Sequence, residues 1–155
     1  MKELEELRNF LIEAKKGTYA NGSAKKCESS RLGSKDYEYQ SGNMLYHDTY
    51  FGGLIFIGEE AVYKDGTPIW GMNYRGVTLD VSLEEETIDK ALRPALMQVG
   101  EDDILPLRGP REYRNGKYSY TFKVTGTLED FIGEEEICKD SIPVYRLTCH
   151  GGIIK

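Results

Sequence analysis

The sequence has little of what marks secreted, membrane-bound or metal-binding proteins. Only three cysteines are present, Cys27, Cys138 and Cys149, an odd number without the spacing of a zinc site. No apolar run approaches the roughly 18 residues that span a membrane. The charged start Met1-Lys2-Glu3-Leu4-Glu5 is unlike a signal peptide. We therefore expect a cytoplasmic protein with reduced thiols and no membrane partner, although Cys138 and Cys149 could form a pair.

Positive charge and catalytic motifs are also scarce. The 155 residues include 20 Lys and Arg against 26 Asp and Glu, a formal net charge of -6. Proteins that bind nucleic acids directly need a basic face, so we expect no direct nucleic-acid partner. The two histidines, His47 and His150, have no ligand spacing around them. We predict no metal site, no cofactor and no catalytic residues.

What the chain does contain is an internal similarity. Phe56-Ile57-Gly58-Glu59-Glu60 recurs as Phe131-Ile132-Gly133-Glu134-Glu135, and flanking positions such as Tyr46 and Tyr120 also match. Similarity at a fixed period is typical of a duplicated supersecondary unit. The sequence therefore predicts a single domain, 1–155, built from an internal repeat over about 37–76 and 111–151.

Two periodicities predict the elements. Apolar residues at helical spacing predict a helix over about 3–16 and another after Ser82, which Pro94 should kink. Period-two alternation, clearest in Trp70, Met72 and Tyr74, predicts antiparallel strands after each helix. The predicted fold class is α+β, with two duplicated helix-plus-antiparallel-β-meander units that form a curved sheet or packed sheets with pseudo-twofold symmetry. Two units that join in this way form a cleft between them, and ligands commonly bind in such clefts.

Acidic residues interrupt the apolar strand faces. Asp48 falls where the other half has Phe122, and Glu60 and Glu135 share a face with apolar side chains under strict alternation. The two glutamates could be an acid–base pair or attract a cation. They could instead be structural, each held by Tyr or Arg, or lie on a solvated face. Asp48 could anchor a cationic or amine-bearing ligand, or it could lie at an exposed strand end.

We expect a ligand site in the cleft, where aromatic and acidic side chains from both halves meet. The predicted ligand-binding residues are Arg31, Tyr46, Asp48, Tyr50, Glu60, Trp70, Tyr74, Tyr120, Glu135 and Tyr145. Arg31 and Lys35 belong to a long polar segment, 17–36, that could be an anion-contacting lid or a solvated connection. Either side chain could reach Asp48.

Several motifs together resemble a known family. They are Ser29-Ser30-Arg31, the stretch 46–53, Phe56-Ile57-Gly58-Glu59-Glu60, the stretch 68–74, Arg108-Gly109-Pro110 and His150-Gly151-Gly152. In these the chain resembles an uncharacterised bacterial domain family whose members stand alone or follow the helix-turn-helix DNA-binding domains of transcriptional regulators. The resemblance implies a sensory or interaction module, and it implies no catalytic residue.

The function that we expect is non-catalytic, sensor-like binding of a small molecule in an aromatic, acid-lined cleft between the repeats. One alternative is an enzyme that uses a carboxylate acid–base pair drawn from Glu60, Glu135 and Asp48. Another is a protein-interaction module, with a protein as the partner. The shape of the cleft distinguishes these hypotheses, because a binding site needs an aromatic cavity with only one or two polar anchors.

Overall fold

A computed structural model describes residues 1–155, which form two helices and eight strands. In chain order the elements are α1 (Lys2–Gly17), β1 (Lys35–Ser41), β2 (Met44–Gly52), β3 (Ile55–Lys64), β4 (Thr67–Thr78), α2 (Glu85–Leu96), β5 (Glu112–Asn115), β6 (Tyr118–Thr127), β7 (Asp130–Lys139) and β8 (Ile142–Ile153). All eight strands belong to one antiparallel sheet, in the order β1-β2-β3-β4-β8-β7-β6-β5.

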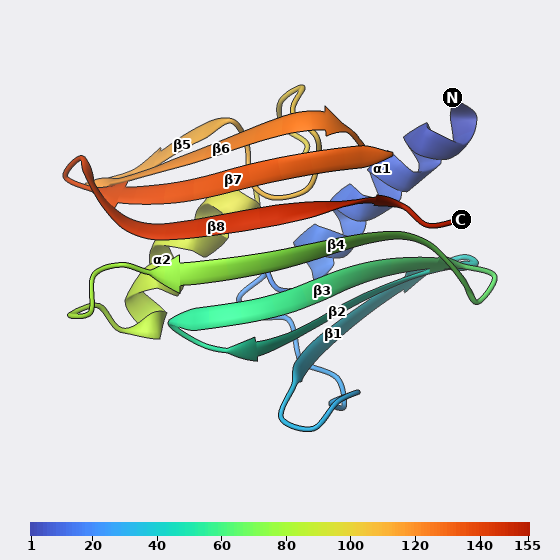
Figure 1. Cartoon of the computed structure of the whole chain (residues 1–155), viewed down its shortest axis with the longest axis horizontal. Helices are drawn as coiled ribbons and strands as arrows, with labels where there is room; N and C mark the ends of the chain where they lie inside the picture. The colour runs from blue at the N-terminus through green and yellow to red at the C-terminus, as the bar shows by residue number, and fades with distance from the viewer.

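The predicted α+β class, with two helix-plus-meander units, is wrong. Strands hold 48% of the residues and helices only 18%, so the protein is mainly β. The two groups of strands merge because β4 and β8 pair along their length, from Trp70↔Ile153 to Thr78↔Tyr145. Figure 1 shows these two strands side by side in the middle of the sheet. Each would otherwise present a row of unpaired backbone groups at an edge, and pairing them with one another removes both edges.

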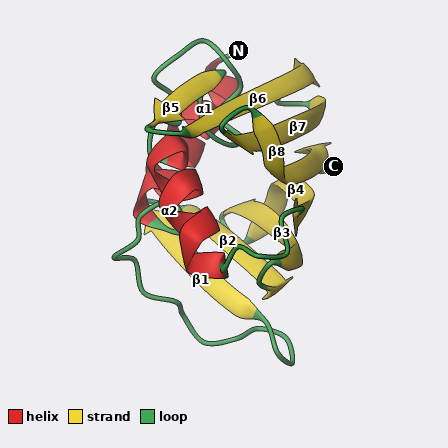
Figure 2. Ribbon diagram, turned by 90° about the vertical axis from the view of Figure 1, so that its left-hand side faces the viewer, coloured by secondary structure: helices red, strands yellow, loops and turns green.

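The sheet is strongly curved, and the helices lie on its concave side. Figure 2 shows the strands curling around one side of the molecule with α1 and α2 across the opening. The apolar stripe of α1 includes the buried Leu7 and Leu11, and that of α2 includes Ile88 and Leu92. Burying these stripes against the apolar face of the sheet is the main source of stability. Neither helix is long and apolar enough to cross a membrane.

Alternate side chains of each strand point into this core. On β4 the inward set includes Trp70 and Met72, both fully buried. The Trp70 ring stacks on Phe131 of β7 at 5.8 Å, and its Nε1–H donates to the carbonyl oxygen of Leu128 at 3.0 Å. Trp70 is therefore a core residue that joins β4 to the strands beyond β8. All three cysteines are free thiols.

Candidate functional site

Three carboxylates are buried on the concave face of the sheet. Asp48 of β2, Glu60 of β3 and Glu135 of β7 expose 4%, 3% and 1% of their surface. Asp48 and Glu60 face one another across the β2–β3 ladder. A buried carboxylate destabilises a fold unless hydrogen bonds and an opposite charge compensate for its lost hydration. The partners of each carboxylate therefore indicate its role.

The contacts of Glu135 fully compensate for the lost hydration of its carboxylate. Arg108 makes a two-pronged contact, in which Nε donates to Oε2 at 2.9 Å and Nη2 donates to Oε1 at 2.8 Å. The hydroxyls of Tyr120 and Tyr145 donate to the same carboxylate at 2.6 and 3.0 Å. Burial, the largest single influence, lowers the pKa of Arg108, but the charge of Glu135, its hydrogen bonds to Arg108 and the nearby Tyr145 and Tyr120 together raise that pKa well above its usual value. These contacts match the structural alternative for Glu135, a glutamate held by Tyr and Arg.

Glu60 has a lysine as its counter-ion. The Nζ of Lys15, a buried residue of α1, donates to Glu60 Oε2. The same Nζ lies 5.7 Å from the centre of the Tyr46 ring. Burial, and after it the charge of Glu60, raises the pKa of Tyr46 well above its usual value, so its hydroxyl stays protonated. This ion pair fastens α1 to the sheet.

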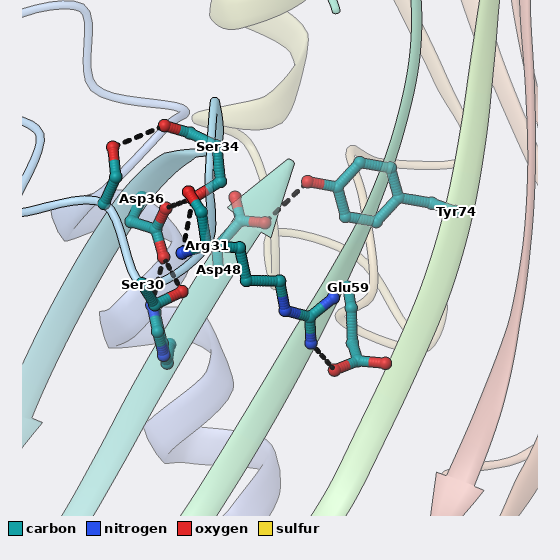
Figure 3. Close-up of polar contacts among 9 residues, drawn as sticks. Ser30, Arg31, Ser34, Asp36, Asp48, Glu59 and Tyr74 are labelled. Atoms are coloured by element: carbon teal, nitrogen blue, oxygen red, sulfur yellow. Dashed lines mark hydrogen bonds and ion pairs between the residues drawn. The ribbon is translucent and has the colours of Figure 1, made fainter. Parts of the chain in front are cut away.

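Asp48 differs from both glutamates because it has no ion-pair partner. Its one hydrogen bond comes from Tyr74 of β4, whose hydroxyl donates to Oδ1 at 2.5 Å, as Figure 3 shows. Burial, followed by the charge of Glu60, raises the pKa of Asp48 to about 7, and the hydrogen bond, Lys15 and Arg108 lower it less. Asp48 is thus a buried carboxyl group that changes its charge near neutral pH.

A glycine allows Tyr74 to reach Asp48. The two residues lie on β4 and β2, so the Tyr74 ring must cross β3, which lies between them. It crosses at Gly58, where a Cβ atom would lie only 2.4 Å from the Tyr74 hydroxyl and 2.7 Å from Cβ of Tyr50. Any larger residue at this position would displace the ring. Gly58, conspicuous in the sequence, therefore positions the site.

A narrow pocket opens beside Asp48, between the sheet and α2. Its cavity volume is about 30 Å³, or about 500 Å³ when all the empty space up to its open mouth is included. The pocket is therefore a slot that suits a slender group. The residues that line this slot are Tyr19, Asp48, Tyr50, Gly53, Leu54, Phe56, Tyr74, Thr78, Glu85, Ile88, Asp89, Leu92 and Arg108.

A second, deeper hollow adjoins the slot. Tyr19, Asp48 and Arg108 line both spaces, and the deeper one continues to the Lys15–Glu60 pair. Asp48 and Arg108 therefore lie where the two spaces meet. Arg108 is already bound to Glu135, so of these two charged residues only Asp48 lacks an ion-pair partner.

Charged residues also surround the mouth of the slot. Asp89 accepts a hydrogen bond from the Tyr19 hydroxyl at 2.7 Å and pairs with Arg93 at 3.2 Å. The Nζ of Lys35 donates to the carbonyl oxygen of Gly52 at 2.9 Å and lies 5.6 Å from the Tyr50 ring centre. Lys35 is thus at the rim and does not bond to Asp48.

Nine of the ten predicted site residues fall into three places: the slot, the deeper hollow and the core. Asp48, Tyr50 and Tyr74 line the slot, while Tyr46 and Glu60 line the deeper hollow with Asp48. The fully buried Trp70, Tyr120, Glu135 and Tyr145 line neither space, although three of them form the Arg108 cluster.

Arg31 lies elsewhere. Its Nη2 contacts Glu59 at 3.3 Å, and both side chains are exposed, as Figure 3 shows. Glu59 neighbours Glu60 on β3 and therefore points to the opposite, outer face of the sheet. Arg31 and Asp48 thus belong to different faces.

Sequence reasoning missed the cations of the site and its helical wall. Arg108 and Lys15 compensate the buried glutamates, and Tyr19 and Asp89 narrow the slot. One signal in the sequence pointed to them. A buried acid needs a basic partner, and only a few basic residues of this chain stand within or beside an apolar pattern. Lys15 follows the α1 stripe, and Arg108 lies among Pro106, Gly109 and Pro110, a segment with no periodicity.

Comparison with known proteins yields one match. No curated protein and no solved structure matches the chain significantly. A family model described as a domain of unknown function, DUF5680, matches residues 48–154. The matched region runs from Asp48 through β8 and includes Gly58, Tyr74, Arg108 and Glu135. Since it covers well over half of the chain, the protein belongs to the DUF5680 family.

Proposed function

We propose that the protein is a non-catalytic binding domain for a small molecule that carries an amine or another cationic group. The observation that carries this proposal is the difference in partners among the three carboxylates buried on the concave face of the sheet. Glu60 and Glu135 each have a cation from the chain, whereas Asp48 has only the Tyr74 hydroxyl and faces the slot. A ligand cation bound at Asp48 would supply the missing partner.

The walls of the slot favour the same class of ligand. Tyr19 and Tyr50 are among its aromatic residues, and a cation over an aromatic ring gains about 0.5–2 kcal/mol. The charges of Asp89 and Glu85, which also line the slot, are balanced by Arg93 at 3.2 Å and Lys35 at 3.9 Å, so Asp48 is the lining carboxylate without a cation. The positive charge of Arg108 is balanced by Glu135, so it opposes a bound amine only weakly. The narrowness of the slot favours an unbranched primary amine.

We further infer a sensory role, as the resemblance to bacterial domains joined to helix-turn-helix units implies. The slot lies between α2 and the sheet, so a ligand that contacts both would stabilise their packing and could pass a signal through α2. The net charge of -6 supports a small molecule or a protein, not nucleic acid, as the direct partner of this domain.

A thermal-unfolding screen tests the proposal. Alkyl amines, polyamines and quaternary ammonium compounds are compared at pH 8 with carboxylic acids of the same size. A ligand at 100 times its Kd adds about 2.7 kcal/mol to the free energy of unfolding, which raises Tm by roughly 5–10 °C in a chain of this length. The shift should appear with amines, be absent in Asp48→Asn, and shrink at pH 5.5, where Asp48 is protonated. Equal shifts in Asp48→Asn, or shifts with acids alone, would contradict the proposal.

One observation favours an enzyme as the second candidate. A carboxyl group with a pKa of about 7, next to a tyrosine hydroxyl, suits proton transfer at neutral pH. Because Glu60 and Glu135 are held by cations, Asp48 would be the acid–base residue. NMR spectra of each amine that shifts Tm, recorded during incubation with the protein, distinguish the two functions. An unchanged ligand supports binding, and a new product supports catalysis.

A further inference from the structure

A second cluster of functional side chains lies on the opposite face of β1 and β2. One ligand atom each of Cys27, Glu38 and His47 lies within 4.8 Å of the other two. Glu38 and His47 are direct cross-strand partners, and Cys27 is joined to Asp36 of β1 by an isolated bridge, with its N–H donating to the Asp36 carbonyl oxygen at 2.9 Å. All three residues are therefore held by paired backbone.

A buried carboxylate orients the histidine in this cluster. Asp36 is completely buried, and its Oδ2 lies 2.7 Å from Nε2 of His47. The hydroxyls of Ser30 and Ser34 donate to the same carboxylate at 2.6 and 2.5 Å, as Figure 3 shows. A metal-binding histidine typically donates one ring N–H to such a carboxylate and binds the metal through its other nitrogen. Asp36 thus supplies the outer support that a metal ligand needs.

We propose that Cys27 Sγ, a Glu38 carboxylate oxygen and His47 Nδ1 bind a Zn²⁺ ion, with a fourth position open to water or another ligand. Sulfur, nitrogen and oxygen ligands at 2.0–2.3 Å in a tetrahedron lie about 3.3–3.8 Å apart. The three ligand atoms, which lie within 4.8 Å of one another, therefore need to approach by up to about 1.5 Å. Thiolate and imidazole ligands favour Zn²⁺ over Mg²⁺ or Ca²⁺, which prefer oxygen.

The ion would connect parts of the chain that are distant in sequence. Cys27 belongs to the connection between α1 and β1, whereas Glu38 and His47 lie on the first two strands. Metal binding would cross-link this connection to the sheet at its edge. The site is separate from the slot, because His47 and Asp48 are consecutive residues of one strand and point to opposite faces.

Cobalt substitution tests the site directly. The reduced, metal-free full chain is titrated with Co²⁺, which gives a thiolate-to-metal charge-transfer band only when a cysteine binds it. Zn²⁺ affinity is then measured by competition. We expect one Co²⁺ per chain, displaced by Zn²⁺. The band should disappear in Cys27→Ser, and Glu38→Gln and His47→Gln should each weaken Zn²⁺ binding at least 10-fold.

The chain offers a matched control. Cys138 is also half-buried and lies 3.5 Å from a carboxylate oxygen of Glu136, but no histidine joins that pair. Cys138→Ser should therefore keep the band and the Zn²⁺ affinity. Ser30→Ala, which removes one hydrogen bond from Asp36, should fold and bind Zn²⁺ more weakly. A wild-type chain without the band, a band that survives in Cys27→Ser, or one lost in Cys138→Ser would overturn the proposal.

Discussion

Replacing Asp48 by asparagine should change how the stability of the protein depends on pH. In the unfolded chain an aspartate has a pKa of about 3.9, and in the folded protein burial and the charge of Glu60 raise it to about 7. Between these values the folded state holds a proton that the unfolded state has lost. The contribution of Asp48 to stability is therefore greatest below pH 4 and is lost as the pH rises to 7.

The size of this effect follows from the difference in pKa. Each pKa unit corresponds to 1.36 kcal/mol, so a rise of about 3 units sets an upper limit of ~4 kcal/mol on the stability lost between pH 4 and pH 8. Asparagine is similar in shape to aspartate and does not ionise, so the Asp48→Asn variant should not lose this stability as the pH rises. Relative to wild type, the variant should gain at least about 1 kcal/mol between pH 5 and pH 8.

Urea unfolding of both proteins at pH 5, 6, 7 and 8 measures this change. Taking the difference between variant and wild type at each pH cancels the contributions of distant groups. Tyr74→Phe provides a second check. Because the Tyr74 hydroxyl lowers the pKa of Asp48, its removal should move the loss of stability to higher pH. A difference between Asp48→Asn and wild type that stays constant from pH 5 to pH 8 would refute the assignment of a raised pKa.

Three further substitutions have definite expected costs in urea unfolding. Arg108→Ala leaves Glu135 buried and unpaired, so it should cost about 3–5 kcal/mol, and a loss below 1 kcal/mol would show that water replaces the guanidinium. Trp70→Ala empties a fully buried position and should cost about 3–5 kcal/mol; an unchanged midpoint would mean that Trp70 is not in the core. Gly58→Ala forces a methyl group against two tyrosines and should cost about 1–3 kcal/mol, whereas Gly71→Ala, whose Cβ would meet its neighbours at 3.4 Å or more, should cost less.

Local elements could be predicted from the sequence because their signals are local. The apolar stripe from Leu4 to Ala14 correctly indicated a helix, and α1 spans Lys2–Gly17. Alternation around Trp70 correctly indicated an antiparallel strand, whereas Trp70 itself, predicted to bind the ligand, lies in the core. The fold class was wrong because strands hold 48% of the residues and helices only 18%, and the pairing of β4 with β8, strands far apart in sequence, leaves no local signal. The internal repeat over 37–76 and 111–151 stays a prediction.

The site could be predicted only in part, for a similar reason. Polar residues on apolar strand faces revealed the buried carboxylates, because that signal lies within each strand. Their counter-ions come from α1 and from the segment before β5, whose approach to the sheet is a tertiary property. The cluster of Cys27, Glu38 and His47 was missed because Glu38 and His47 become neighbours only through the register of β1 and β2. Spacing along the chain does not show such proximity.

The ion pair between Lys15 and Glu60 bears on where this domain begins. The family match starts at Asp48, inside β2, and omits α1 and β1. A fragment cut at that point would expose the concave face that α1 covers and would leave Glu60 without its cation. Removing one partner of a buried ion pair costs about 3–5 kcal/mol, a large share of the 5–15 kcal/mol that stabilises a typical domain. The Lys15–Glu60 pair and the buried stripe of α1 therefore tie α1, which precedes the matched region, to the strands within it.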